Sequence, residues 1–149
     1  MKLAVLAGTQ SGCGKTTIML ALLQYLKTQE DILSFKSGPD FLDPLWHQEV
    51  TGKLSYNIDT RMIGAELSAE LIRKQAQQAG FGLIEGVMGL FDGRSGVGGS
   101  GSSAELAKTL NLPVLLVVDA KGMSGSIVAM VSGYVLYAQK MGVVIAGVI

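Results

Sequence analysis

The sequence has little cysteine and little histidine, with one of each in 149 residues. The single thiol, Cys13, excludes an internal disulfide framework and a metal site built from several cysteines. The lone His47 has no neighbouring cysteine or second histidine with which to form a metal-ligand cluster, so we expect it, like Trp46, to be scaffold. One cysteine is typical of a reducing compartment, and we expect a cytoplasmic protein.

Net charge and long apolar runs are also missing. Twelve basic residues balance twelve acidic ones, so the chain has no overall field that would attract nucleic acid or an acidic membrane. The apolar runs 114–118 and 143–149 are far shorter than the ~20 residues of a spanning helix, and the run 3–7 is shorter than the apolar part of a signal peptide. We therefore expect no nucleic-acid partner and no membrane.

Short apolar runs alternate with stretches of helical spacing. Strand-length runs with little polar alternation occur at 3–7, 32–35, 81–87, 113–118 and 143–149, as in strands covered on both faces. Helical periodicity occurs at 15–28, 65–79, 103–110 and 124–141. This order predicts an α/β fold of the P-loop NTPase type, doubly wound, with a mainly parallel sheet and helices on both faces.

No linker or repeat divides residues 1–149, so we expect one domain. The last apolar run has no following helix, which leads us to expect an incomplete N-terminal part of a longer protein. A second glycine-rich stretch, 93–101, is either a mobile surface loop or an ordered substrate loop, because glycine permits both.

The segment 7–17, AGTQSGCGKTT, follows a predicted strand and opens a predicted helix, which is the context of a phosphate-binding loop. The usual pattern has glycine at position 9, whereas this chain has Thr9 preceded by Gly8, so we expect a variant loop. Lys15 should reach the β- and γ-phosphates, and Thr16 should place its hydroxyl on Mg²⁺. The expected nucleotide-binding residues are Gly12, Cys13, Gly14, Lys15, Thr16 and Thr17.

Two interpretations of the Cys13 side chain are possible. Near a helix N-terminus its thiol could be acidic and reactive, but no base is evident, and a small filler between glycines is the favoured interpretation.

Three separated motifs carry a family resemblance. Residues 36–47, KSGPDFLDPLWH, are similar to the K-x-G-P-D-[FY]-[IL]-D-P segment of the cobyrinic acid a,c-diamide synthase family. Residues 85–93, EGVMGLFDG, resemble that family's E-G-x-M-G-L-[YF]-D-G signature, and 112–120 resemble its next strand. The resemblance implies an ATP- and Mg²⁺-dependent ligase, glutamine-hydrolysing at full length, that converts the a- and c-carboxylates of cobyrinic acid, or of a related corrinoid, to amides through an acyl phosphate in cobalamin biosynthesis.

The motifs also suggest site residues. Asp40 and Asp43 follow a strand at the edge where open α/β sheets bind ligands, although both are also ordinary turn and helix-cap signals. By resemblance they act in catalysis with Lys15 and Glu85, and Mg²⁺ would lie near Thr16, Asp43 and Glu85. A buried Glu85 could instead simply pair with Lys15 or Lys36.

Four further residues are expected to contact the substrate. Lys36 would pair with a phosphate or a substrate carboxylate, unless it is a strand-end lysine in solvent. Phe41 and Leu42 would face the macrocycle. Asp92 would hold substrate or only form the Asp92-Gly93 turn.

The resemblance implies a C-terminal glutaminase domain that supplies ammonia. Neither Cys13 nor His47 is suitably placed to form its cysteine–histidine pair, so that domain would lie outside this chain. We also expect that a second copy of the protein is a partner, in a homodimer. Two rivals stay open: a partitioning or septum-positioning ATPase switch, whose loop has lysine where this chain has Gln10, and a dethiobiotin synthetase.

Overall fold

The computed structural model describes residues 2–76, 79–93, 96–97 and 100–149. Its centre is a six-stranded sheet in the order β3-β2-β4-β1-β7-β8, and every neighbouring pair of strands is parallel. The predicted mainly parallel α/β fold is therefore confirmed. The strands are β1 (Lys2–Gly8), β2 (Ile32–Ser37), β3 (Tyr56–Ile58), β4 (Phe81–Gly89), β7 (Val114–Val117) and β8 (Ile145–Val148).

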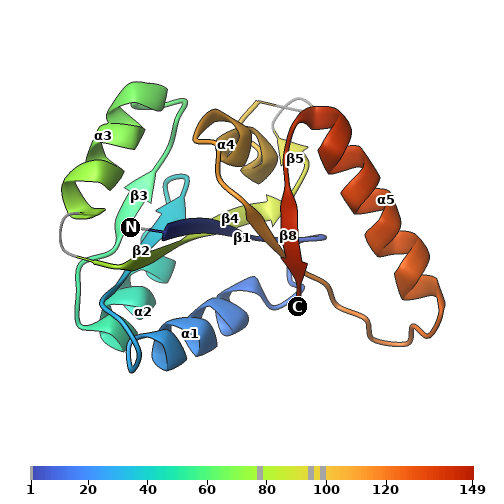
Figure 1. Ribbon diagram of the computed structural model, residues 1–149, viewed down its shortest axis with the longest axis horizontal. Coiled ribbons are helices and arrows are strands. Elements are labelled where there is room, and N and C mark those ends of the chain that lie inside the picture. The colour runs from blue at the N-terminus through green and yellow to red at the C-terminus, as the bar shows by residue number, and fades with distance from the viewer. Residues whose placement is uncertain (1, 77–78, 94–95, 98–99) are drawn as a thin grey trace.

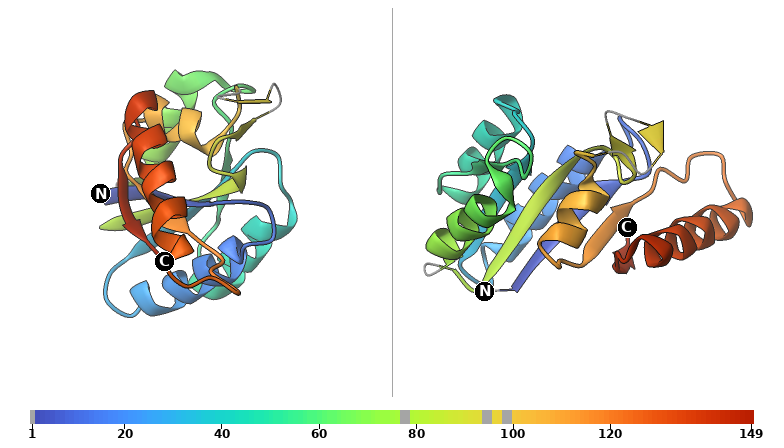
Figure 2. Two further views of the ribbon diagram at one scale, coloured as in Figure 1. Left: turned by 90° about the vertical axis from the view of Figure 1, so that its right-hand side faces the viewer. Right: turned by 90° about the horizontal axis from the view of Figure 1, so that it is seen from above.

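Helices cover both faces of the sheet. In Figure 1, α1 and α2 lie below the sheet and α3 and α4 above it, and Figure 2 shows α5 beside the β8 end. The predicted helix 15–28 ends two residues early, and the last residues of the predicted helix 65–79 include 77–78, which lie outside the described part. The helices are α1 (Lys15–Leu26), α2 (Leu42–Thr51), α3 (Gly64–Ala76), α4 (Ser103–Thr109) and α5 (Ser126–Met141).

Alternate side chains of the central strand β1 enter two different cores. Val5 and Ala7 pack with residues of α3, α4 and α5, whereas Ala4 and Leu6 pack with Met19 and Leu23 of α1. Successive side chains of a strand point to opposite faces, so a strand covered on both sides is apolar throughout. This explains the near-continuous apolar runs of the sequence.

Two structural features were not predicted. The three-residue strand β3 is too short to give a periodic signal, and α2 lies within the Asp-Pro motif, where turn residues masked its helical character.

In the glycine-rich stretch, β5 (Asp92–Gly93) pairs antiparallel with β6 (Gly96–Val97). Residues 94–95 and 98–99 lie outside the described part, so the choice between a mobile and an ordered loop stays a prediction.

Candidate active site

The phosphate loop runs from Thr9 to Gly14 between β1 and α1. Gly12 and Gly14 have φ angles of 77° and 93°, a left-handed region that glycine enters without steric cost. The Lys15 side chain is buried and donates a hydrogen bond from Nζ to the carbonyl oxygen of Gln10, 3.1 Å away. The ammonium group thus lies over the loop, where a bound phosphate would meet it.

The packing around Gly8 explains why a glycine is needed at this position, one residue before the first glycine of the usual pattern. A Cβ atom built on Gly8 would overlap the sulfur of Cys13, and it would come within 3.0 Å of Cγ of Lys15. Cys13 itself is buried in the core beneath the loop, with Leu6 and Met19 in the same cluster. The burial of Cys13 therefore agrees with the interpretation that its side chain is a small filler, and the close packing at the end of β1 accounts for the glycine at position 8.

Glu85 and Lys36 are brought together by strand pairing. Glu85 of β4 is in register with Leu6 of β1 on one side and with Lys36 of β2 on the other. Paired residues of adjacent strands present their side chains on the same face, here the face covered by α1 and α2. Thr16 in the first turn of α1 donates a hydrogen bond to Oε1 of Glu85 at 2.6 Å. The phosphate loop and the end of β4 are thus directly connected.

Lys36 is the centre of the carboxylate cluster. Its Nζ lies 2.5 Å from Oδ2 of Asp43, 3.3 Å from Oε1 of Glu85 and 4.0 Å from Oδ2 of Asp40. It also donates a hydrogen bond to the carbonyl oxygen of Gly86 at 3.3 Å. Only 4% of Lys36 is exposed, so the alternative of a strand-end lysine in solvent is wrong.

His47, which the sequence analysis expected to be scaffold, completes this buried network. Its Nε2 lies 2.7 Å from Oε2 of Glu85, and its Nδ1 lies 3.1 Å from Oγ of Ser55. The Ser55 hydroxyl donates a hydrogen bond to the carbonyl oxygen of Ser34, 3.0 Å away, so His47 links Glu85 of β4 to β2 through Ser55.

The helix α2 supplies the signal that would have located His47. Asp43 and His47 stand four residues apart, which places them on one face of a helix, one turn from each other. That face meets the sheet where Glu85 lies. Assigning the segment 42–51 as a helix would therefore have pointed both side chains at the same site.

The cluster lowers the pKa values of two of its carboxyl groups, Glu85 and Asp40. Burial acts to raise the pKa of Glu85, but the hydrogen bond from His47, the charge of Lys36 and the hydrogen bond from Thr16 outweigh it and lower that pKa. For Asp40, partial burial is likewise outweighed, by the backbone N–H groups of Asp43 and Leu42 and by Lys36, and its pKa is lowered. Two carboxylates with lowered pKa values thus lie beside Lys36.

Asp40 has the helix-capping role that its turn context indicated. Its Oδ1 accepts hydrogen bonds from the backbone N–H groups of Leu42 at 2.9 Å and Asp43 at 3.2 Å, at the start of α2. Phe41 and Leu42 are 85% and 69% exposed. Their apolar side chains are exposed at the start of α2, and the exposed Trp46 lies in the same helix as Leu42.

A cavity of about 420 Å³ joins these groups. It is lined by the predicted residues Gly12, Gly14, Lys15, Thr16, Thr17, Lys36, Asp40, Asp43 and Glu85, together with Ser11, Gly86, Val87 and Met88.

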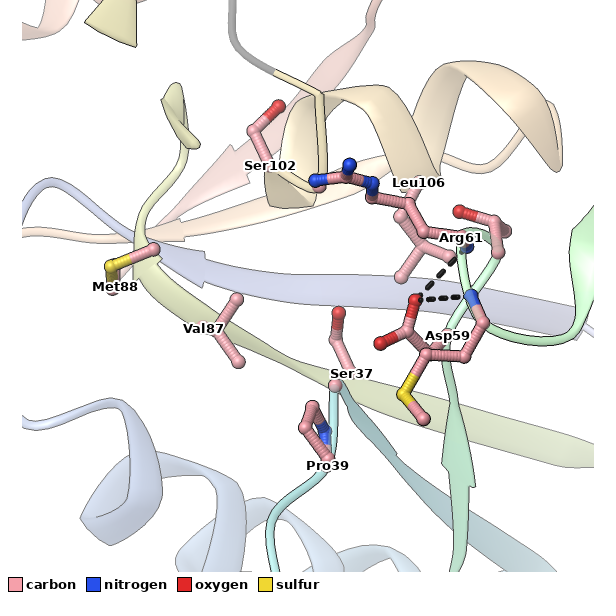
Figure 3. Close-up of a pocket in the computed structure, with 12 residues that line it drawn as sticks. Ser37, Pro39, Asp59, Arg61, Val87, Met88, Ser102 and Leu106 are labelled. Atoms are coloured by element: carbon pink, nitrogen blue, oxygen red, sulfur yellow. Dashed lines mark hydrogen bonds between the residues drawn. The ribbon is translucent and has the colours of Figure 1, made fainter. Parts of the chain in front are cut away.

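Cys13, Phe41, Leu42 and Asp92 are absent from this lining. Instead, Oδ2 of Asp92 accepts a hydrogen bond from the N–H of Gly89 at 2.9 Å, which matches the turn reading of Asp92. A second cavity, of about 460 Å³, lies beside the first and shares Val87 and Met88 with it (Figure 3).

The donor set fits a hard cation held together with a nucleotide. Within residues 2–76, 79–93, 96–97 and 100–149, no group of three or more His, Cys, Asp or Glu side chains forms a self-sufficient metal site. Mg²⁺, however, usually takes one or two protein oxygens and completes its shell with phosphates and water. The Thr16 hydroxyl and the carboxylates of Asp43 and Glu85 are oxygen donors of that kind.

Residues 4–148 match the family described as the CobQ/CobB/MinD/ParA nucleotide binding domain. The chain belongs to this family. The structure adds the expected fold and phosphate loop, and nucleotide binding is the property common to the family's description. Along the described residues, no helix is long and apolar enough to span a membrane.

Several curated relatives carry the name cobyrinate a,c-diamide synthase. The protein of Caldanaerobacter subterraneus is 43% identical over 139 residues, which are 93% of this chain and 30% of the relative. The Gloeobacter violaceus protein is 42% identical over 146 residues, 97% of this chain and 32% of the relative. The resemblance predicted from the three motifs is confirmed, and the chain spans about three tenths of the length of these relatives.

Proposed function

We propose that this chain is the ATP-binding, carboxylate-activating part of a ligase that amidates the a- and c-carboxylates of cobyrinic acid or a closely related corrinoid. The observation that carries the proposal is the buried network in which Thr16 of the phosphate loop contacts Glu85, and Glu85 contacts Lys36 and His47. The names of the relatives give the substrate and product.

In the proposed reaction, a carboxylate oxygen of the acceptor attacks the γ-phosphorus of ATP, and the bond to the β-phosphate oxygen breaks to release ADP. Ammonia then attacks the carbonyl carbon of the acyl phosphate, loses a proton, and inorganic phosphate leaves with the former carboxylate oxygen. Lys15 and the loop amides offset the repulsion between carboxylate and triphosphate. Asp40 and Asp43 hold the acceptor side of the cavity, and Lys36 neutralises the carboxylates around it.

Thr16, Asp43 and Glu85 would hold Mg²⁺, which would supply additional neutralisation of the phosphate charge. His47 fixes the orientation of Glu85, since its Nε2 donates to the oxygen that Thr16 does not contact. Lys36 occupies the space between Asp43 and Glu85 and supplies a positive charge there. The substrate roles of Phe41, Leu42 and Asp92 stay predictions.

We further propose that ammonia comes from glutamine through a glutaminase domain outside this chain. Cys13 is buried beneath the loop and His47 is bonded to Glu85, so these two side chains cannot form a nucleophile and base. The proposed cytoplasmic location and homodimer are tested by fractionation and by sedimentation.

The identity of residue 10 argues against the alternative that the protein is an ATPase switch. An ATPase switch of the partitioning type uses a lysine at this place of its loop, whereas here the Gln10 backbone oxygen accepts from Lys15. The relatives named above are ligases rather than switches or dethiobiotin synthetases.

The decisive experiment supplies the protein that carries this chain with ATP, Mg²⁺, glutamine and cobyrinic acid whose carboxylates contain ¹⁸O. We expect two successive acid-to-amide mass changes, with ¹⁸O appearing in the released phosphate. ATP-dependent dimers without any amide product would favour the switch, and amide formation without label in phosphate would refute the acyl phosphate.

The variant Lys15→Ala provides the test of the phosphate loop. We expect at least about a thousand-fold loss of amide formation, because the motif's cation offsets charge on the transferred phosphoryl group. Lys74→Ala, which removes an exposed lysine of α3, is the matched control and should leave turnover unchanged. Undiminished turnover in Lys15→Ala would contradict the assignment.

A further inference from the structure

The second cavity is not lined by residues of the phosphate loop, but it adjoins the first cavity, with which it shares Val87 and Met88. It lies beyond the carboxyl end of β2, between the residues that follow β3 and those that precede α4 (Figure 3). Its walls are largely apolar, with Pro39, Met62, Val87 and Leu106 among the lining residues. A ligand that fills both cavities would therefore place an apolar framework here and a reacting group beside Lys15.

Arg61 is the cationic residue of this cavity among the described lining residues. Figure 3 shows its guanidinium group extending towards Ser102. Its Nη1 donates to the carbonyl oxygen of Ser100 at 3.3 Å, and no carboxylate of the described residues forms an ion pair with it. A guanidinium group has five N–H donors, so most of its capacity is available to an anion.

The position of Arg61 is set by two neighbouring residues. Oδ1 of Asp59 accepts hydrogen bonds from the backbone N–H groups of Arg61 at 2.9 Å and Met62 at 3.2 Å, which fixes the turn. A Cβ atom on Gly101 would approach Cδ of Arg61 to 3.2 Å, so this glycine leaves space for the side chain. Asp59 is the one acidic lining residue described in this cavity, and its Oδ1 is already engaged.

We propose that Arg61 binds a carboxylate of the acceptor other than the one being activated, which makes the second cavity a subsite for a polyacid with an apolar framework. This inference rests on the proposed function. A substrate amidated at two positions carries at least two carboxylates, and the one away from the phosphate loop needs a cationic partner where water is partly excluded. The planar guanidinium group binds carboxylates in bidentate geometry, which a lysine cannot reproduce.

The test measures binding of cobyrinic acid by calorimetry to the protein that carries this chain, as wild type, Arg61→Gln and Arg61→Lys. We expect Arg61→Gln to weaken binding about ten-fold and Arg61→Lys to weaken it less, since each loses part of a charge-assisted interaction. Arg73→Gln, at an exposed arginine of α3, is the matched control and should bind like wild type. Binding of an ATP analogue should stay unchanged in all variants.

A second ligand separates charge recognition from a folding defect. The same acceptor with its acid groups converted to methyl esters should bind wild type and Arg61→Gln equally, because it offers no carboxylate to the guanidinium group. Equal binding of the free acid by wild type and Arg61→Gln would overturn the subsite. Weaker binding of the methyl ester by Arg61→Gln than by wild type would also overturn it. A wild type that binds the acid through Arg61 but forms no amide would refute the proposed function and leave the subsite standing.

Discussion

At the scale of single residues, Glu85 poses the sharpest energetic problem in the structure. Its side chain is fully buried, and an isolated carboxylate in such a place would cost several kcal/mol. Hydrogen bonds from His47 and Thr16 and the charge of Lys36 compensate for the lost hydration. The stability of the chain and the geometry of the site therefore depend on the same contacts.

The substitution His47→Ala should destabilise the fold by about 2–4 kcal/mol, because Glu85 keeps its burial and loses its strongest partner. Urea unfolding of the chain measures this change. Ser55→Ala, which removes the hydroxyl that contacts His47 and donates to the Ser34 carbonyl but leaves the contact of His47 with Glu85, should cost about 1–2 kcal/mol. The double variant His47→Ala with Glu85→Gln should lose less than the sum of the single losses, and strict additivity would contradict the coupling.

The lowered pKa of Glu85 predicts a dependence of stability on acidity. A carboxyl whose folded pKa lies below its usual 4.5 stabilises the fold above that value, and the contribution disappears as pH falls through the folded pKa. We expect the free energy of unfolding to fall more steeply below about pH 4.5 in wild type than in Glu85→Gln. Identical slopes in a series of urea unfolding curves would rule this out.

Individual residues differed in how far their environment could be predicted. Lys15 and Thr16 were located from the loop motif, since a glycine-rich turn followed by a helix sets where they point. The burial of Lys36 and the partner of His47 were not predicted. Both depend on residues 38 to 50 positions away in the sequence.

At the scale of secondary-structure elements, α2 turns a sequence motif into a binding surface. Asp40 caps its first turn, Asp43 and His47 face the sheet, and Phe41 and Trp46 face outward. The sequence analysis noted turn and helix-cap signals in this motif but predicted no helix, and Pro44 lies in the first turn of α2, where a missing N–H is tolerated. Turn chemistry and helix initiation use the same residue types.

The junction of β1 with the phosphate loop leads to a prediction at this scale. Gly8→Ala should cost about 1–3 kcal/mol and weaken nucleotide binding, because the new methyl group overlaps Cys13 and crowds Lys15. Adding Cys13→Ala should restore part of the loss by removing the sulfur. Thermal unfolding and nucleotide titration measure both effects.

Gly125→Ala is the appropriate control for the glycine substitution. A Cβ atom there meets no other atom within 4 Å, and its backbone is in the right-handed helical region. We expect a change within about 0.5 kcal/mol. If Gly8→Ala behaved like this control, the close approach of loop and strand would not limit the loop sequence.

At the scale of the whole molecule, the sheet order brings the site together. β4 lies between β1 and β2, so the phosphate loop after β1 and the acidic motif after β2 meet on the two sides of Glu85. The carboxyl ends of parallel strands share one edge, which is where open α/β sheets bind their ligands.

Nucleotide binding should therefore stabilise the entire chain. At about one hundred times its Kd, a non-hydrolysable ATP analogue with Mg²⁺ should add about 2.7 kcal/mol to the free energy of unfolding. Chelation of Mg²⁺ should remove much of this gain, and Lys15→Ala should show little gain under either condition. Thermal unfolding provides the measurement, and an equal gain in Lys15→Ala would contradict the role of the loop.

The sequence by itself determined the alternation of strands and helices, the phosphate loop and the family motifs, because these follow from local periodicity and from residue types at short spacing. Only the tertiary structure decided that Lys36, His47 and Glu85 form one buried network and that Arg61 faces a cavity. Strand order and helix packing create those contacts between distant segments, and burial there makes charges pair that would stay solvated in an unfolded chain.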